Sequence, residues 1–454
     1  MPEKEPSGGA ARVARRSGFG TATLALATLL LPASGHGQTS AVDSLVAVAM
    51  AASPLVQAAE RRVDAARARV PPAGALPDPV LSAGIVNLPV SEPGFDDFMT
   101  MSTVALGQRL PYPGKLGLAR RAAEHELRAV EARVEVARRE VEAGVRKAYY
   151  ALAFLDRSLE IVARNQALLV DFIAVTESRY GVGTGGQQDI LKARVEAARL
   201  AERAVALAEA RGARLARLNA LLDRAGDTPV EQPRVPPRIA RAAVPDDPAR
   251  IRFTSDALGA RAADSPLPAL DALQERAIRA SPEVRAHQAE IAARAARVEL
   301  ARKAHLPDFD VSVRYGQRVD RPDMASVMVS VPLPVNRGER QDQQVAEAES
   351  ELAAMQADHH AMVNRIQADV AEAYADLERD RAQLALFARS IIPQGRAALE
   401  SATAAFQVGR ADFLTLLENQ TTLYDYEIAY FRALTAFASS LVELERTVGA
   451  EVLP

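Results

Sequence analysis

The two halves of this sequence repeat the same short signals in the same order. The matching pairs lie 226 to 230 residues apart, and they are Ser53-Pro54 with Ser281-Pro282, Pro77-Asp78 with Pro307-Asp308, and Val182-Gly183 with Val408-Gly409. Two long units therefore share one plan with only small insertions, as expected after a duplication. Each unit also combines helical sequence with two short alternating strands, which an ordinary helical bundle does not need.

The N-terminus has the pattern of a secretory signal peptide. Arg12, Arg15 and Arg16 precede an apolar run over 19–31, and small residues follow that run at a place where a signal peptidase can cut. The apolar run is too short for a membrane-spanning helix. We therefore expect residues 1–37 to be a leader that is removed from the mature protein.

Composition excludes several classes of protein. The sequence contains no cysteine, so it has neither disulfides nor thiolate metal sites. The formal net charge is −3, and removal of the leader makes it more negative, which argues against a nucleic-acid partner. No nucleotide-binding glycine loop and no Ser-His-Asp spacing occurs, so we expect neither catalysis nor a cofactor.

Long helices dominate the prediction. Between Val145 and Tyr180 the apolar residues recur in alternating steps of three and four, which is a heptad seam sustained over more than five repeats. Extended back to Leu116, such a helix holds roughly 60 residues and measures on the order of 90 Å, which is too long for a compact core. The predicted long helices are 116–179 and 339–405, with return helices at 187–222 and 412–448. Pro393 should bend or break the second long helix.

The prediction of a membrane-spanning part depends on the strands. After the leader no run of about 18 apolar residues occurs, so any membrane-spanning part must consist of strands. We predict strands at 79–90, 98–110, 308–317 and 324–334, each of about the length that crosses a bilayer at a tilt. The residues expected to face lipid are Val311, Val313, Val327, Val329 and Val331. Four strands are too few to close a barrel, for which about eight is the minimum, so several chains must combine. A small sheet that covers a helical core in a soluble protein is the alternative.

The predicted organisation has three parts after the leader. Two structural repeats cover 38–225 and 269–454. Between them, the connector at 226–268 contains eight prolines and no sustained periodicity, so we expect irregular structure there.

Taken together, these signals resemble the TolC family of outer-membrane efflux channels, over essentially the whole mature sequence. Besides the repeated pairs above, the segments that carry the resemblance are Leu76-Pro77-Asp78-Pro79, Leu306-Pro307-Asp308, Gln108 to Lys115, Leu218 to Leu222, and Leu414 to Gln420. The resemblance implies a mainly α fold with a small membrane β component, built from a duplicated helix-strand-strand-helix-helix unit. In the implied assembly a trimeric β-barrel in the outer membrane continues into a long α-helical coiled-coil tunnel across the periplasm.

The same resemblance implies a function and partners. It implies a homotrimeric exit duct, embedded in outer-membrane lipid, that passively conducts small compounds or metal ions out of the cell. A periplasmic adaptor protein and an inner-membrane pump, expected to be of the RND type, complete such a tripartite system. Two alternatives stay open, namely an exit duct for type I protein secretion and a soluble periplasmic coiled-coil scaffold.

The site residues follow from the resemblance, position by position. The family's adaptor-docking tips correspond to Val182, Gly183, Thr184, Val408, Gly409 and Arg410. Its periplasmic gate corresponds to Glu418, with Asp189 at the related place in the first unit and Thr415 where several members keep an acid. Glu418 as a solvated helix residue is the alternative.

A metal-binding hypothesis concerns one helix face. The stretch Met99-Thr100-Met101, with the Leu-Pro-Tyr-Pro-Gly-Lys segment that follows, looks most like members associated with heavy-metal efflux. Met355, His359 and Met362 lie at positions i, i+4 and i+7, and thioether and imidazole donors suit Cu(I). Methionine at helical spacing is more often seam packing, which is the alternative for this set.

Overall fold

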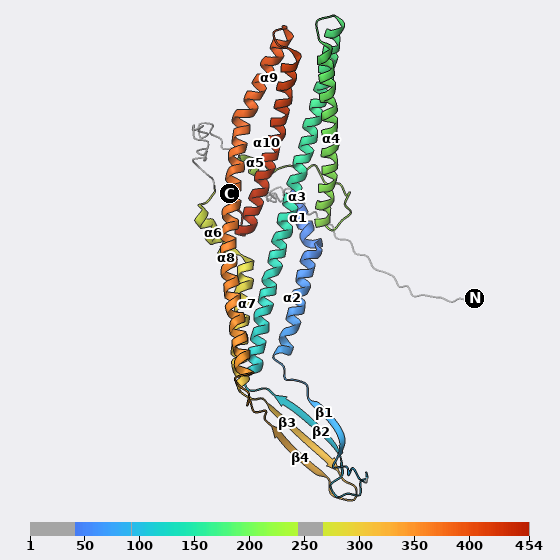
Figure 1. The fold of residues 1–454 in the computed structure, drawn as a ribbon, viewed down its shortest axis with the longest axis vertical. Helices are drawn as coiled ribbons and strands as arrows, with labels where there is room; N and C mark the ends of the chain where they lie inside the picture. The colour runs from blue at the N-terminus through green and yellow to red at the C-terminus, as the bar shows by residue number, and fades with distance from the viewer. Residues whose placement is uncertain (1–40, 92, 244–266, 454) are drawn as a thin grey trace, which may run out of the picture. The chain divides into compact units, whose positions relative to one another are not determined.

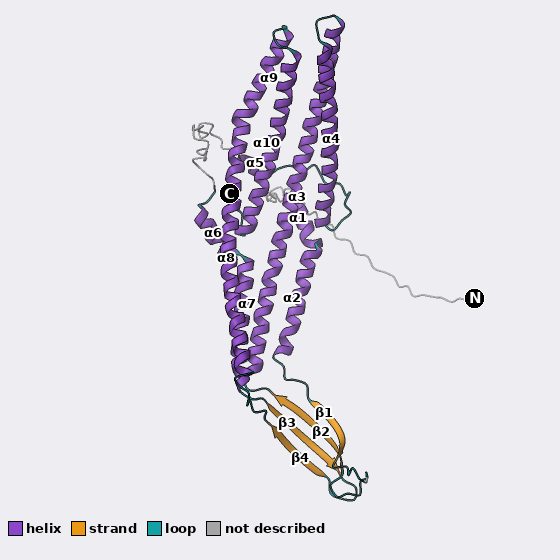
Figure 2. Cartoon of the chain, in the orientation of Figure 1, coloured by secondary structure: helices purple, strands orange, loops and turns teal. Residues whose placement is uncertain are grey.

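The computed structural model describes residues 41–91, 93–243 and 267–453. The expected leader, 1–37, and part of the expected connector, 244–266, lie outside the described residues. Within them the chain consists of helices and one four-stranded sheet (Figure 2).

The duplication is visible in the order of the elements (Figure 1). The first half contains α1 (Ala41–Ala52), α2 (Pro54–Ala73), β1 (Val80–Val86), β2 (Met101–Leu110), α3 (Lys115–Gly181) and α4 (Gln187–Leu221). The second half contains α6 (Leu270–Ala280), α7 (Pro282–Arg302), the short 3-10 helix η2 (Lys303–His305), β3 (Phe309–Gln317), β4 (Met324–Ser330), α8 (Gln341–Leu386), the π-helical turn η3 (Phe387–Ile391), α9 (Ile392–Gln407) and α10 (Phe413–Val448). The predicted helix-strand-strand-helix-helix unit is therefore present twice.

The repeated Ser-Pro pair starts a helix in each half. Pro54 and Pro282 occupy the first positions of α2 and α7, where a missing N–H costs little because that group has no partner inside the helix. Ser281 caps α7, since its hydroxyl accepts a hydrogen bond of 3.2 Å from the amide of Val284. The repeated Ser-Pro signal therefore marks the start of the helix that precedes each pair of strands, α2 in the first half and α7 in the second.

The long helix α3 organises the first half. It has 67 residues, which gives a length of about 100 Å. Val145, Leu152 and Val162 are completely buried on its seam. The N-terminal part of α3 packs against α2, whereas its C-terminal part packs against α4 and α10, so one helix contributes to several apolar clusters in succession.

The second long helix is interrupted where proline predicts it. The π-helical turn η3 separates α8 from α9, and Pro393 lies in the first turn of α9. A proline inside a helix lacks the N–H that closes a turn, and a π-helical turn absorbs the resulting distortion. The α-helical hydrogen-bonding pattern therefore changes next to Pro393, while the chain stays helical through η3 and does not break.

The connector is less irregular than predicted. A seven-residue helix, α5 (Pro237–Ala243), lies within it, and Ile239 and Ala243 are buried in the largest apolar cluster. Prolines suggested irregular structure, but Pro237 stands at the helix start, where proline is compatible with a helix. The beginning of the connector is held by Asn219, whose Nδ2 donates to the carbonyls of Gly226 and Thr228 at 2.8 and 2.9 Å.

The sheet has the order β1-β2-β3-β4 with every pair antiparallel. The strands are shorter than predicted: β1 ends at Val86, β2 begins only at Met101, and β4 ends at Ser330, so Val331 lies one residue beyond its strand. Asn87 ends β1 because it adopts a positive φ of 58°. The alternation of apolar and polar residues continues beyond the strands into the turns, where the residues no longer pair with a neighbouring strand. The sequence pattern therefore overestimates the strand lengths.

One face of this sheet is apolar and exposed. Leu81, Leu106, Val313 and Val327 form a single cross-strand row, and their exposed fractions are 71, 54, 53 and 73%. The equivalent row on the other face consists of Ser82, Ala105, Arg314 and Ser326. An exposed apolar face of this kind needs lipid or another apolar surface to cover it.

A helix that crosses a membrane must be both long and apolar, and the helices of the described residues can be compared with that requirement. No single helix there combines the length and the apolar composition needed to cross a membrane, and only the bent pair α1 and α2, with an angle of 42° between them, passes that test jointly.

A carboxylate fastens the sheet to the helices. Asp308 directly precedes β3, and its Oδ1 accepts hydrogen bonds from Lys115 Nζ at 2.7 Å and from the Tyr112 amide at 3.0 Å. Its Oδ2 accepts a third from Arg109 Nη2 at 3.2 Å. Burial raises the pKa of Asp308, but these hydrogen bonds outweigh that effect and hold the pKa below its usual value. The contact is therefore fully formed at neutral pH and is lost only as the pH falls through that lowered pKa.

The first prediction concerns the apolar face. Val329→Arg places a charge on it, beside Val311 of β3, and should destabilise the membrane-inserted protein by roughly 2–4 kcal/mol if the residue lies near the bilayer midplane. Ser330→Arg is the control, because it lies on the opposite face and pairs with Asp310. The measurement is the yield of protein in the outer-membrane fraction, and equal yields for both variants would contradict the assignment of the faces.

Candidate functional site

Both helix-helix turns have the same geometry. Gly183 has a φ of 76° and Gly409 a φ of 72°, so each adopts the left-handed conformation that favours glycine. The amide of Thr184 donates to the carbonyl of Arg179 at 2.9 Å, and the amide of Arg410 donates to that of Ala405 at 2.8 Å. These are Schellman turns, which satisfy the last carbonyls of α3 and α9.

The tips are open on the outside. Val182 and Val408 precede these glycines and are 73 and 69% exposed. A Cβ atom added at Gly183 or Gly409 would meet no atom within 4 Å among the described residues. Each turn thus presents a valine and a stretch of uncovered backbone, which is a suitable surface for a second protein.

The three predicted gate residues lie close to these turns but in different surroundings. Glu418 is exposed on the wall of a groove of about 600 Å³ between α4 and α10, where Lys192 also lies. Thr415 is engaged in the cap of α10, since its amide and its hydroxyl both donate to Asp412 Oδ1, at 2.8 and 2.6 Å. These hydrogen bonds lower the pKa of Asp412. Asp189 lies in the first turn of α4, where the helix dipole favours an acid.

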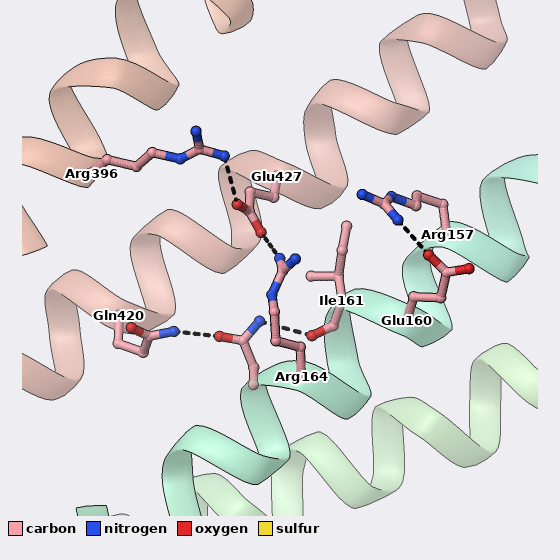
Figure 3. Close-up of polar contacts among 8 residues, drawn as sticks. Arg157, Glu160, Ile161, Arg164, Arg396, Gln420 and Glu427 are labelled. Carbon is pink, nitrogen blue, oxygen red and sulfur yellow. Dashed lines mark hydrogen bonds and ion pairs between the residues drawn. The ribbon is translucent and has the colours of Figure 1, made fainter.

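Sequence reasoning missed a set of polar contacts between the two hairpins α3–α4 and α9–α10 (Figure 3). Glu427 of α10 is paired with Arg164 of α3 and, at 3.3 Å, with Arg396 of α9. The carboxylate is only 15% exposed, so water screens these contacts less than it screens surface pairs. One acid therefore joins three helices from both halves of the chain.

An amide pair adds to this connection. Gln420 Nε2 donates to Asn165 Oδ1, and Asn165 Nδ2 donates to the carbonyl of Ile161 at 2.8 Å (Figure 3). Asn165 is buried, so both of its polar ends need the partners that they have. This pair sets the register of α3 against α10, because a shift of one residue in either helix would leave the amide unpaired.

Arginines on aromatic rings complete the contact between the hairpins. The guanidinium of Arg203, on α4, lies 5.2 Å from the ring centroid of Tyr424 and pairs with Asp425 at 3.1 Å. The guanidinium of Arg179, next to the first turn, lies 4.5 Å from the ring centroid of Phe406. Such cation–π contacts hold the two hairpins together, at the turns through Arg179 and farther along α4 through Arg203. Burial raises the pKa of Tyr424, so it stays neutral at physiological pH.

The candidate metal ligands are not presented as a set. Met362 is only 4% exposed and belongs to the largest apolar cluster, whereas Met355 and His359 are partly buried. Among the described residues no group of three His, Cys, Asp or Glu side chains is placed to hold a metal ion. The position of Met362 is that of a seam-packing residue.

Comparison with known proteins agrees with this architecture. The model of the outer membrane efflux protein family matches residues 45–226 and 273–450, which are the two halves of the duplication. The cobalt-zinc-cadmium resistance protein CzcC of Cupriavidus metallidurans is 25% identical over 408 residues, covering 87% of this chain and 86% of that protein.

Solved structures show the same fold. The outer-membrane channel OprN is 19% identical with a TM-score of 0.74, and the match covers 91% of both chains. The outer membrane protein VceC of Vibrio cholerae is 20% identical with a TM-score of 0.72, covering 90% of this chain and 96% of that one.

The chain belongs to the outer membrane efflux protein family. It is accordingly a passive channel protein of the outer membrane, with its helical tunnel in the periplasm, and it is not an enzyme. The resemblance to the TolC family is confirmed, and the alternative of a soluble scaffold is wrong.

The second prediction concerns Glu427. Glu427→Gln removes the charge that Arg164 and Arg396 share, and should lower the free energy of unfolding by about 1 kcal/mol, because both arginines are at least half exposed. Glu400→Gln, an exposed acid on α9, is the control and should stay within about 0.5 kcal/mol of the wild type. Thermal unfolding of detergent-solubilised protein measures the difference. Identical behaviour of the two variants would show that Glu427 does not join the hairpins.

Proposed function

We propose that three copies of this chain form one duct, which works with a periplasmic adaptor and an inner-membrane pump of the RND type. The trimer is supported by the sheet, which has an exposed apolar face and whose outer strands, β1 and β4, pair with no further strand in the described part of the chain. In lipid every backbone N–H and C=O needs a partner, so an open sheet must close.

The strand directions allow closure by identical copies. Because all neighbours are antiparallel and the strand number is even, β1 and β4 run in opposite directions. The β4 edge of one copy then meets the β1 edge of the next as another antiparallel pair. Three copies of a four-stranded sheet fall inside the range of about 8 to 26 strands found in membrane barrels.

We propose divalent metal ions as the cargo. The support is the relative CzcC, whose name gives cobalt, zinc and cadmium resistance and which aligns over most of both chains. In this assignment the pump selects the ion, and the duct supplies a path that excludes lipid.

The third prediction tests this function. Deleting the gene should raise the cellular content of Co²⁺, Zn²⁺ and Cd²⁺ after a metal challenge, because the exit route is lost. Elemental analysis of washed cells measures it, with the complemented strain as the control. Unchanged metal content together with loss of a secreted protein would favour the type I secretion duct instead.

We place the periplasmic gate at Glu418. Its carboxylate is exposed near the second turn, and closure of three copies around one axis would bring three such groups together. Like charges held close attract cations and raise one another's pKa.

The fourth prediction follows from this proposed ring of three Glu418 carboxylates. Glu418→Gln should abolish the block of single-channel current by divalent cations in a planar bilayer, while the trimer remains intact. Glu202→Gln removes an exposed acid from α4 and should leave the block unchanged. If Glu418→Gln retains the block, Glu418 lies outside the conduction path.

We assign adaptor docking to the two tips, Val182, Gly183 and Thr184 in one half and Val408, Gly409 and Arg410 in the other.

The fifth prediction separates the role of Gly409 in the turn from its role in the docking surface. Gly409→Ala strains the positive φ with little added bulk, whereas Gly409→Leu adds an obstruction into the open space outside the turn. Efflux and crosslinking to the adaptor should therefore fall much further for leucine than for alanine, at equal trimer yield. If Gly409→Leu crosslinks to the adaptor as the wild type does, Gly409 serves only to form the turn and has no part in docking.

A further inference from the structure

Two histidines from different helices lie close together at the contact between α7 and α8. The ring centroids of His287, on α7, and His359, on α8, lie 6.3 Å apart with 38° between the ring planes. They are separated by 72 positions in the sequence, so no local motif joins them. Both side chains are partly buried.

The same ring atom is unsatisfied in both histidines. Each Nδ1 is buried, and neither has a hydrogen-bond partner within the described part of the chain. A neutral imidazole that carries its proton on Nε2 presents a lone pair at Nδ1, and burying that lone pair without a partner is unfavourable. Two neighbouring rings that each bury such an atom are therefore a feature that packing alone does not account for.

The separation of the rings suits one shared metal ion. Metal–nitrogen distances for histidine are about 2 Å, so two imidazoles on one ion have centroids roughly 5 to 6.5 Å apart, depending on the angle at the metal. A direct hydrogen bond between the two Nδ1 atoms is absent, since each lacks a partner.

The donor set selects the kind of ion. Structural Zn²⁺ takes four protein ligands, and among the described residues no third His, Cys, Asp or Glu joins these two histidines to form such a group. Two neutral imidazoles without a carboxylate instead match a soft monovalent d¹⁰ cation, which is stable with two nearly linear ligands. Met362, one helical turn from His359, packs in the apolar cluster and leaves the coordination to the imidazoles.

We infer that His287 and His359 form a two-coordinate site for Cu(I), which ties α7 to α8. Binding is a ligand exchange in which both Nδ1 lone pairs replace the ion's solvent ligands, and no electron is transferred. The site is reached from a groove of about 710 Å³, lined by α2, α3, α7 and Arg365 of α8, because His287 belongs to the wall of that groove. This site is separate from the proposed conduction of cargo and does not depend on it.

The experiment uses Ag⁺ as a redox-stable probe on the mature trimer in detergent, purified without a polyhistidine tag and in chloride-free buffer. The wild-type protein should bind one Ag⁺ per chain more tightly than any remaining sites. His287→Gln and His359→Gln should each weaken that binding at least tenfold. His360→Gln is the matched control, because it lies next to His359 but is exposed.

X-ray absorption on the unmodified protein adds a readout that does not depend on the folding of variants. The inference predicts two nitrogen neighbours of the bound ion and no sulfur. Sulfur neighbours would overturn it in favour of Met355 and Met362 as ligands. It is also overturned if the wild type binds no more tightly than the His287→Gln, His359→Gln double variant, or if His360→Gln loses as much as His359→Gln.

Discussion

A four-stranded sheet with an exposed apolar face leaves the outward-facing backbone groups of its two outer strands without a paired strand among the residues that the structure describes. Water satisfies such groups at a soluble edge, but the interior of a membrane does not. The apolar row through Leu81, Leu106, Val313 and Val327 needs an apolar cover, which lipid supplies in the outer membrane, and lipid requires that β1 and β4 be paired. Closure of the sheet by further copies of the chain pairs both edge strands and lets the apolar face contact lipid. The helices attached to the sheet must then follow the same rotational symmetry.

The helices fit that constraint. Each strand is joined to a helix by a short connection, and Asp308 links the end of β2 and the start of α3 to β3 through three hydrogen bonds. The helices then pack through successive apolar clusters rather than around one centre, which suits the wall of a tunnel. Between the hairpins, Glu427 and the Asn165–Gln420 pair supply specific polar contacts where apolar seams alone would allow sliding.

Much of this fold is predictable from the sequence because its signals are local. The heptad seam of α3, the interruption at Pro393 and the glycine turns depend on residues a few positions apart. The ends of β1 and β4 are less predictable, since alternation continues past the last paired residue. The contacts of Glu427 with Arg164, and of His287 with His359, are invisible in the sequence, because each joins helices far apart in the chain. The proposed gate role of Glu418 depends on neighbouring copies, which the signals within one sequence do not place.

The closure of the sheet is the central claim, and crosslinking between its edges tests it most directly. The sequence has no cysteine, so Ser82→Cys on β1 and Ser326→Cys on β4 would introduce the only thiols. Both positions lie in one cross-strand row, roughly 14 Å apart within a chain because three strand spacings separate them. A bismaleimide shorter than that distance, applied to whole cells, should yield covalent species of two and three chains and none larger. Exclusively single chains, or a ladder that continues past three, would contradict a closed trimer.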